Sequence, residues 1–366
     1  MIKKVEYLDL DRLAQDIVNG RELTDENLRE LLCLTEEDEI QKLHYVARKV
    51  RDHFFGNKVF LYSFVYFSTH CKNNCAFCYY NRCNDIQRYR LDIEEIRNIC
   101  RALKNESIHM VDLTMGEDPY FHNEPERFID IVRTVKDETG LPIMISPGVL
   151  DDKTLIQLHE NGADFLALYQ ETHDRELYRK LRVGQSFEER VHAREFAKMI
   201  GYCVEDGILT GVGNDIESTI KSLRGMQKNK PDMVRVMTFV PQEGTPLGEV
   251  SQESSLSELK IISILRLMFP DRLIPASLDL EGIDGMVHRL NAGANVVTSI
   301  IAANSSLEGV VNYDRNLEER DRDPKSVVDR LRTMGMEPAS QADFKRIREK
   351  STGKPVGIVG LPEVHA

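Results

Sequence analysis

Three cysteines lie close together at Cys71, Cys75 and Cys78, in the run Cys-Lys-Asn-Asn-Cys-Ala-Phe-Cys. Three thiolates at this spacing can bind three irons of a cubane [4Fe–4S] cluster and leave the fourth iron open. A catalytic metal needs an open coordination position, whereas a structural metal site is normally closed. The spacing therefore predicts a catalytic iron–sulfur cluster.

Two alternatives use Cys83 as a fourth thiolate, either in a closed zinc site or in a ferredoxin-like electron carrier. Zinc sites usually combine two Cys-x-x-Cys hooks, and no second hook follows here. The chain has seven cysteines, and three of them fall within eight residues. This pattern is unlike a secreted disulfide framework and predicts a reducing, cytoplasmic environment.

Composition narrows the range of partners. The 366 residues carry a formal net charge of −12, which disfavours nucleic acid and anionic membrane surfaces as ligands. No apolar run is long enough to span a bilayer, and the first fifteen residues lack the apolar core of a signal peptide. We therefore expect a cytoplasmic protein that binds a small molecule, without nucleic acid or membrane.

The elements that must position the cysteines form a regular series. Eight β-forming runs alternate with helical segments, namely Val59–Ser68, Met110–Met115, Leu141–Ser146, Phe165–Tyr169, Cys203–Thr210, Met233–Phe239, Ile274–Leu278 and Asn295–Ser299. Such alternation indicates a parallel sheet, and eight units predict an α/β fold of the TIM-type (β/α)8 barrel class. The cysteines directly follow the first strand, at the mouth where the active sites of such barrels lie.

Outside the barrel, the periodicity predicts further helices. Residues 1–56 form an N-terminal helical extension, with Leu10, Leu13 and Ile17 at helical spacing. The barrel occupies residues 57–304, and residues 305–350 contribute C-terminal helices packed on it. Residues 351–366 contain Gly and Pro without periodicity, which predicts a loose tail.

The cysteine run resembles that of the radical S-adenosylmethionine (SAM) superfamily. The resemblance implies that SAM binds the open iron and that its cleavage gives a 5′-deoxyadenosyl radical. Phe77 would support the adenine, although it could equally just pack the loop. Gly116-Glu117 ends the second strand like the "GE" motif of the superfamily, so Glu117 would hold the SAM amino group. Ser146 ends the third strand and would bond the methionyl part or form a turn.

A later stretch resembles the branch that contains biotin synthase and a hydrogenase-maturation enzyme. It runs from Tyr169-Gln-Glu171-Thr through Arg-Lys-Leu-Arg182 to Phe-Glu-Glu-Arg190. The resemblance implies that Glu171 contacts the ribose or amino end of SAM and that Arg190 contacts its carboxylate, with Arg182 as a third candidate. In the alternative, Arg182 and Arg190 are solvated helix residues.

Polar side chains near the ends of several strands are candidates for the substrate site, namely Asp112, Arg235, Thr238, Ser277 and Asp279. A buried arginine demands an anionic partner, which a substrate carboxylate could provide. Asp112 and Asp279 suit an ammonium group, so the set describes an amino-acid pocket. In the alternative, Arg235 forms an internal salt bridge with Asp279 or Asp112.

From about residue 40 to 350 the chain resembles the methylornithine synthase family of pyrrolysine biosynthesis. The supporting stretches are CKNNCAFCYYN, LTMGEDPYF, LYQETHDRELYRKLR, VRVMTFVPQEGTP, PASLDLEGIDG and LNAGAN. The resemblance implies a mutase that converts L-lysine to 3-methyl-D-ornithine, with a ferredoxin or flavodoxin as electron donor. The hydrogenase-maturation type is the nearest rival. A non-catalytic iron–sulfur binder would need none of Glu117, Glu171 and Arg190.

Overall fold

The computed structural model describes residues 9–103, 107–301 and 322–352. Its core is one sheet of parallel strands, ordered β8-β7-β5-β4-β3-β1-β10-β9. These are β1 (Lys58–Ser68), β3 (Met110–Met115), β4 (Ile143–Ser146), β5 (Ala163–Ala167), β7 (Cys203–Thr210), β8 (Met233–Thr238), β9 (Pro275–Ser277) and β10 (Val296–Ile300). The two ends of this order meet through a bridge between Met233 and Leu273, so the barrel is nearly closed. The predicted TIM-type fold is confirmed.

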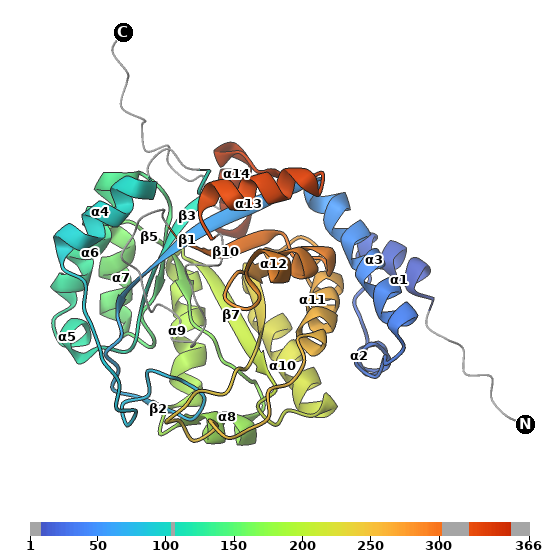
Figure 1. Cartoon of the computed structure of the whole chain (residues 1–366), viewed down its shortest axis with the longest axis horizontal. Coiled ribbons are helices and arrows are strands. Elements are labelled where there is room, and N and C mark those ends of the chain that lie inside the picture. The colour runs from blue at the N-terminus through green and yellow to red at the C-terminus, as the bar shows by residue number, and fades with distance from the viewer. Residues whose placement is uncertain (1–8, 104–106, 302–321, 353–366) are drawn as a thin grey trace, which may run out of the picture.

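Helices cover the outside of the barrel (Figure 1). Along the chain these are α4 (Ile93–Leu103), α6 (Pro125–Thr139), α7 (Asp152–Glu160), α9 (Phe187–Ile200), α10 (Ile216–Asn229), α11 (Leu256–Met268) and α12 (Gly282–Asn291). Asp151, Ser186 and Asp215 are their N-caps, each accepting a backbone N–H three residues on. Among the described residues, no helix combines the length and the apolar character that a membrane span requires.

Several short elements were not predicted, because each is too brief to show a period. They are β2 (Asn74–Cys75), α5 (Pro119–His122), α8 (Arg175–Leu181), β6 (Arg182–Val183) and β11 (Glu337–Pro338). β2 pairs antiparallel with β6, and this pairing joins the cysteine loop to the segment that follows β5. Strand β5 also begins and ends two residues before its predicted bounds.

An N-terminal layer of three helices lies beside the barrel, at the right of Figure 1. It contains α1 (Leu10–Val18), α2 (Asp25–Leu32) and α3 (Glu37–Phe55). Leu28, Leu31 and Leu43 are fully buried, and the layer packs on α10, α11 and α12. Burial of this apolar stripe is what attaches the extension to the barrel.

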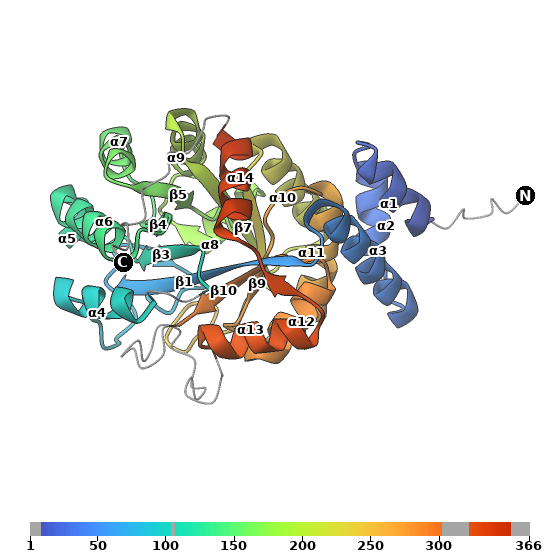
Figure 2. The same ribbon diagram turned by 90° about the horizontal axis from the view of Figure 1, so that it is seen from above.

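The C-terminal helices α13 (Pro324–Thr333) and α14 (Gln341–Thr352) lie at the end of the barrel opposite β2 and α8 (Figure 1). Seen from above, α14 runs across that end (Figure 2). Its Phe344 is 2% exposed and stacks on Phe165, with the ring centroids 5.9 Å apart. The helix therefore closes this end of the barrel. Of the predicted loose tail, Ser351 and Thr352 belong to α14 and the rest lies outside the described residues.

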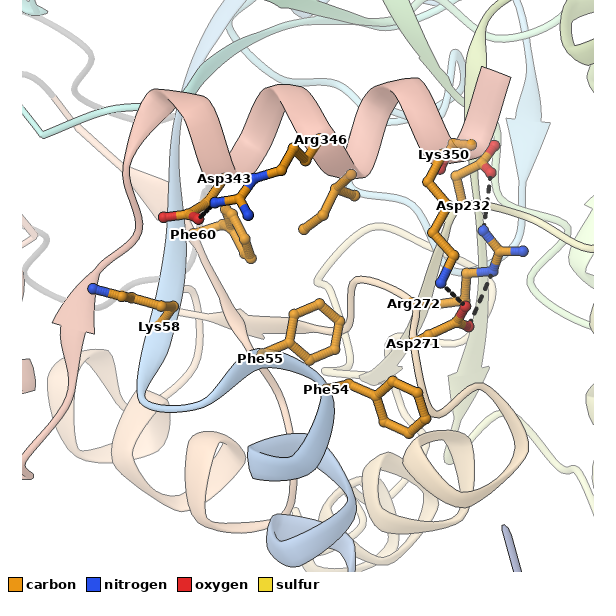
Figure 3. A pocket seen from close by; sticks show the side chains of 12 residues that line it. Phe54, Phe55, Lys58, Phe60, Asp232, Asp271, Arg272, Asp343, Arg346 and Lys350 are labelled. Carbon is orange, nitrogen blue, oxygen red and sulfur yellow. Dashed lines mark hydrogen bonds and ion pairs between the residues drawn. The ribbon is translucent and has the colours of Figure 1, made fainter. Parts of the chain in front are cut away.

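A cavity of about 250 Å³ lies beside α14 at this closed end (Figure 3). Phe54, Phe55 and Phe60 line it, and charged groups surround them. Those charges pair with one another; Lys350, for example, bonds Asp271 at 2.7 Å. The cavity is thus at the opposite end of the barrel from the cysteines.

We predict that Phe344→Ala lowers the free energy of unfolding by about 3–5 kcal/mol, since it empties a fully packed aromatic site. Denaturant unfolding measures the change. Phe54→Ala is the matched control: Phe54 is 38% exposed, so its removal should cost less than about 1 kcal/mol. Equal losses in the two variants would contradict the inference that the packing of Phe344 attaches α14 to the barrel.

Candidate active site

The loop that carries the three cysteines is fixed through its backbone. Cys75 lies in β2, opposite Arg182 of β6, and Ala76 N–H donates to Leu181 O at 2.8 Å. Within the loop, Asn81 Nδ2 donates to Cys75 O at 2.9 Å. These bonds tie the loop to the segment after β5, which carries two of the predicted cofactor residues.

Arg88 is a second clamp on this loop, and sequence reasoning missed it. Its guanidinium donates to Thr69 O at 2.7 Å, Tyr80 O at 3.1 Å, Asn81 O at 2.7 Å and Asn84 O at 3.3 Å. One side chain thus satisfies four carbonyl groups of an irregular segment. Because partially exposed loop backbone has few other partners, Arg88 sets the shape of the loop around the cysteines.

The thiols have the surroundings that a metal cluster requires. Gln185 Nε2 lies 3.0 Å from Cys75 Sγ, and Asn73 N–H donates to Cys71 Sγ at 3.4 Å; such donors favour the thiolate. Burial raises the pKa of Cys78 to about 12, and the nearby charges of Cys75 and Cys71 raise it further. A thiolate there needs a cation such as iron.

In the described residues no three His, Cys, Asp or Glu side chains converge on a single metal ion. A cubane, by contrast, takes each cysteine on a different iron.

Two glycines allow close approaches beside the site, one to the cysteine loop and one to Glu117. A Cβ on Gly116 would lie 2.4 Å from His70 O and 2.8 Å from Cys71 Cβ. A Cβ on Gly148 would lie 2.1 Å from Glu117 Cγ. The sequence shows both glycines, in TMGE and SPG, but gives no hint of what each one touches.

Glu117 is 7% exposed and lies among donors. Its Oε1 accepts Val149 N–H at 3.2 Å and Arg190 Nη2 at 3.4 Å, and Lys72 Nζ is 3.5 Å from Oε2. Burial acts to raise the pKa of Glu117, but the charge of Arg190 and the hydrogen bonds outweigh it and leave the pKa lowered. Glu117 is therefore a carboxylate, as an ammonium partner must be.

Glu171 occupies a strained backbone position, with a φ of 66°. Its N–H donates to Gly207 O at 3.0 Å and its carbonyl accepts Leu209 N–H at 2.9 Å, so β7 holds it there. Its carboxylate forms an ion pair with Arg182, whose guanidinium lies 5.5 Å from the ring centroid of Phe77. Left-handed backbone at a residue other than glycine or asparagine costs free energy, and it persists where the surroundings fix a side chain.

Arg182 and Arg190 are not solvated helix residues. The side chain of Arg190 is 3% exposed and that of Arg182 is 11% exposed. Arg190 donates to Tyr169 O at 3.3 Å and to Gln185 Oε1 at 3.0 Å. In both residues the buried Nε has no partner in the described part of the chain. Two unsatisfied donors beside Glu117 and Glu171 are what the carboxylate and hydroxyl groups of a polar cofactor could satisfy.

A buried network supports Glu171 from behind, and it too was missed. Asp206 Oδ1 accepts Gln170 N–H at 3.0 Å, and its Oδ2 lies 2.9 Å from His173 Nε2 and 3.7 Å from Arg194 Nε. Burial acts to raise the pKa of Asp206, but attraction by Arg194 and His173 and the hydrogen bonds lower it to about 2. Asp206 thereby holds the residues on both sides of Glu171.

A cavity of about 350 Å³ connects the cysteine loop with the strand ends. Phe77, Cys78 and Glu171 line one part of it, and the predicted substrate residues Arg235, Thr238, Ser277 and Asp279 also line it. Asp112 and Ser146 do not line it; instead Ser146 Oγ donates to Asp112 Oδ1 at 2.9 Å. Burial, together with the charge of Glu205, raises the pKa of Asp112 to about 7.

Each charged residue of the predicted substrate site that lines the cavity has an internal partner. Arg235 forms an ion pair, but with Glu205 at 2.8 Å and not with Asp112 or Asp279. Asp279 pairs with Arg322 at 3.2 Å and accepts Ser277 Oγ at 2.7 Å. Thr238 Oγ1 donates to Glu258, which Arg289 also bonds.

Sequence reasoning missed Glu205, Glu258, Arg289 and Arg322. The sequence did contain a signal for Glu205, because side chains two residues apart on a strand point to the same face. Glu205 follows the inward-facing Cys203 by two residues, and the same spacing relates Asp112 to Met110 and Arg235 to Met233.

Comparison with known proteins agrees with this site. Residues 65–224 match the radical SAM superfamily. A 3-methylornithine synthase of Methanosarcina acetivorans is 68% identical over 347 residues, which cover 95% of this chain and 99% of that protein. The chain belongs to the 3-methylornithine synthase family of radical SAM enzymes. The crystal structure of methylornithine synthase (PylB) superposes with a TM-score of 0.89 at 68% identity, covering 92% of this chain and 99% of that chain. The [FeFe] hydrogenase maturase subunit HydE of Thermotoga maritima is 31% identical, over 76% of this chain and 80% of its own length.

Radical SAM enzymes use a [4Fe–4S] cluster and SAM, so these are the cofactors of this member of the methylornithine synthase family. The residues present fit both groups. The thiols Cys71, Cys75 and Cys78 offer three sulfur ligands, and hydrogen-bond donors are aimed at two of them. The buried carboxylate of Glu117 and the unpaired Nε groups of Arg182 and Arg190 suit the amino and acceptor groups of SAM.

We predict that Asp206→Asn lowers the free energy of unfolding by about 3–5 kcal/mol at neutral pH, because it strands the buried Arg194. The pKa of Asp206 is below its ordinary value of 3.8 in the folded protein, so its contribution is complete above pH 3.8. The contribution is lost as the pH falls toward about 2. Urea unfolding of wild type and variant should therefore show a gap that is constant from pH 7 to 5 and narrows below pH 4. A gap that widens with acid would contradict the pairing.

Proposed function

We propose that this chain is a radical SAM mutase that converts L-lysine to 3-methyl-D-ornithine, the first step of pyrrolysine biosynthesis. The observation that carries the proposal is 68% identity to a 3-methylornithine synthase over 95% of the chain. The identity to the hydrogenase maturase subunit is 31% over a shorter span, so that activity is the weaker candidate.

In this proposal Cys71, Cys75 and Cys78 bind the cluster. The cluster and SAM together supply a 5′-deoxyadenosyl radical that takes a hydrogen atom from the substrate. Glu117 holds the ammonium of SAM, because it is a buried carboxylate with a lowered pKa. Arg190 takes the SAM carboxylate and Glu171 a ribose hydroxyl or the amino end.

Three further residues complete the cofactor site in this proposal. Arg182 keeps Glu171 in place through their ion pair. Phe77 supports the adenine. Ser146 acts at the methionyl end of SAM, although its hydroxyl is already bonded to Asp112.

The substrate site is the wall of the cavity farther along the strand ends. The whole cavity, including the part beside the cysteine loop, has a volume of about 350 Å³, which is in the range of small-molecule sites. Arg235 binds the α-carboxylate of lysine and Asp279 one of its ammonium groups. Asp112, which does not itself line the cavity but lies two residues from Thr114 near the end of the same strand, is proposed for the second ammonium group. Thr238 and Ser277 offer hydroxyl groups between these charges.

This assignment gives each segment of the chain a role. Residues 57–304 form the catalytic barrel, residues 1–56 an extension that supports it, and α13 and α14 are the helices that pack on it. An electron donor such as a ferredoxin or flavodoxin reduces the cluster in the cytoplasm.

We predict that anaerobic reconstitution gives about four iron and four sulfide per chain. Cys78→Ala should lose the absorbance of the cluster, because one of three ligands is gone. Cys100→Ala is the matched control: this thiol is also buried, but in α4, and its variant should load normally. Stoichiometric zinc in the purified protein, with no iron uptake, would overturn the cluster assignment.

We also predict that the reconstituted enzyme, with SAM, L-lysine and a reductant, yields an amino acid of the same mass but a different retention time. Mass spectrometry after chromatography detects it. Asp112→Asn and Asp279→Asn should each lower turnover by at least about tenfold, because each removes a charge-assisted contact. Arg235→Lys should lower it as much, because a compact ammonium cannot reproduce the positions of the guanidinium nitrogens. Iron content and SAM affinity should stay at wild-type levels.

The pH dependence tests Asp112 separately. Its pKa of about 7 means that the carboxylate which binds an ammonium is lost as the pH falls below 7. Lysine affinity should therefore weaken from pH 8 to 6 in the wild type and change less in Asp112→Asn.

Variants of Arg235, Asp112 or Asp279 that melt far below the wild type and load no cluster would show that the substituted residue is structural instead.

A further inference from the structure

The guanidinium of Arg235 is held on two sides. Its Nε donates to Glu205 Oε1 at 2.8 Å, and its Nη2 donates to the hydroxyl of Tyr62. The ring of Tyr169 lies under it, with the centroid 5.5 Å from the guanidinium carbon. Within the described residues Arg235 forms its hydrogen bonds through Nε and Nη2 and none through Nη1, and Arg235 lines the cavity. Two of its three nitrogens are therefore committed, and one remains for a ligand.

Glu205 is the anchor of this arrangement. It is fully buried, and both of its oxygens are used, since Oε2 accepts the hydroxyl of Tyr169 at 3.1 Å. The register of β7 and β8 sets Arg235 opposite Gly207, so Glu205 is its diagonal neighbour on the inward face. A Cβ on Gly207 would lie 3.0 Å from the Tyr169 ring and 3.3 Å from Arg235 Cβ. The glycine leaves the room in which the three side chains meet.

We propose that Glu205 is a positioning residue that fixes Arg235 with Nη1 facing the cavity, as the donor for the carboxylate of an amino-acid substrate. This inference rests on the proposed function, because the ligand must be an amino acid. A free guanidinium offers a two-point fork to any anion. Glu205 occupies Nε, so the fork is closed on that side and the carboxylate receives a single, directed contact.

Glu205 also cancels the charge of Arg235. Its carboxylate keeps the pKa of Arg235 well above the ordinary value although the guanidinium is buried. The pair as a whole is neutral, so it attracts a dianion no more than a zwitterion. The site therefore favours a ligand that brings its own ammonium group for a carboxylate such as Asp112, which is the chemistry of an amino acid.

Two substitutions separate positioning from simple charge balance. Glu205→Gln keeps the shape of the side chain but removes its charge. Glu205→Asp keeps the charge but is one methylene shorter, so it cannot hold Nε where Glu205 holds it. Asp232→Asn is the matched control, since Asp232 is also buried and paired with arginine, but belongs to the cavity at the closed end of the barrel.

The test measures binding of L-lysine and of L-lysinamide, in which a neutral amide replaces the carboxylate, by calorimetry on the cluster- and SAM-loaded enzyme. The wild type and Asp232→Asn should prefer lysine by at least about tenfold. In Glu205→Gln and Glu205→Asp that preference should fall to within about threefold, while iron content, SAM affinity and the affinity for lysinamide stay unchanged.

A lysine preference that persists in Glu205→Asp overturns the positioning role and leaves charge balance only. If Glu205→Gln does not fold, Glu205→Asp still decides, because it strands no buried charge. A wild type that converts lysine, with variants that keep the preference, refutes this inference alone. A wild type that binds neither compound refutes the proposed function and this inference with it.

Discussion

A charge buried in an apolar interior needs a partner of opposite sign, and this constraint organises the mouth of the barrel. Glu171 pairs with Arg182, Glu205 with Arg235, Glu258 with Arg289 and Asp279 with Arg322. Each pair joins different elements, so the pairs fix how the strand ends and the loops beyond them are arranged. Asp112 is the exception: it accepts a hydrogen bond from the hydroxyl of Ser146, and its pKa is raised to about 7.

The depth of these pairs follows from the alternation of side chains along parallel strands. Met110, Met144, Cys203 and Met233 point inward as an apolar layer, together with Phe60 and Phe165. Two residues further along the same strands, Asp112, Ser146, Glu205 and Arg235 form the next layer toward the mouth. The apolar layer and Phe344 of α14 seal the other end. Because this seal excludes water from the α14 end, solvent screens the charges of the polar layer only weakly, and the attraction within each ion pair is strong.

Much of the fold and part of the site could be predicted from the sequence, and the contacts that could not be predicted were missed for physical reasons. The eight strands follow from local periodicity, since burial imposes that period on the sequence. The position of Cys71 at the barrel mouth follows from its place directly after the first of these strands. The partner of Arg235 does not, because Glu205 is thirty residues away and meets it only through the register of β7 and β8. Arg88 was missed for the same kind of reason: it bonds backbone carbonyls, which every residue has, so no residue type marks the contact. The pairing of β2 with β6 is too short to leave a pattern.

The strained backbone of Glu171 shows how the loop conformation depends on the neighbouring strand and on the buried charges. A left-handed residue is unfavourable in isolation, yet here β7 bonds both its N–H and its carbonyl, while Asp206 holds Gln170 and His173 on either side. The strand that anchors this turn is the strand that carries Glu205, so β7 holds both Glu171 and the partner of Arg235 in place. A displacement of β7 would move both together. If Glu171 holds SAM and Arg235 the substrate, as proposed, this shared strand keeps the distance between the two bound molecules fixed, which a hydrogen-atom transfer between them requires.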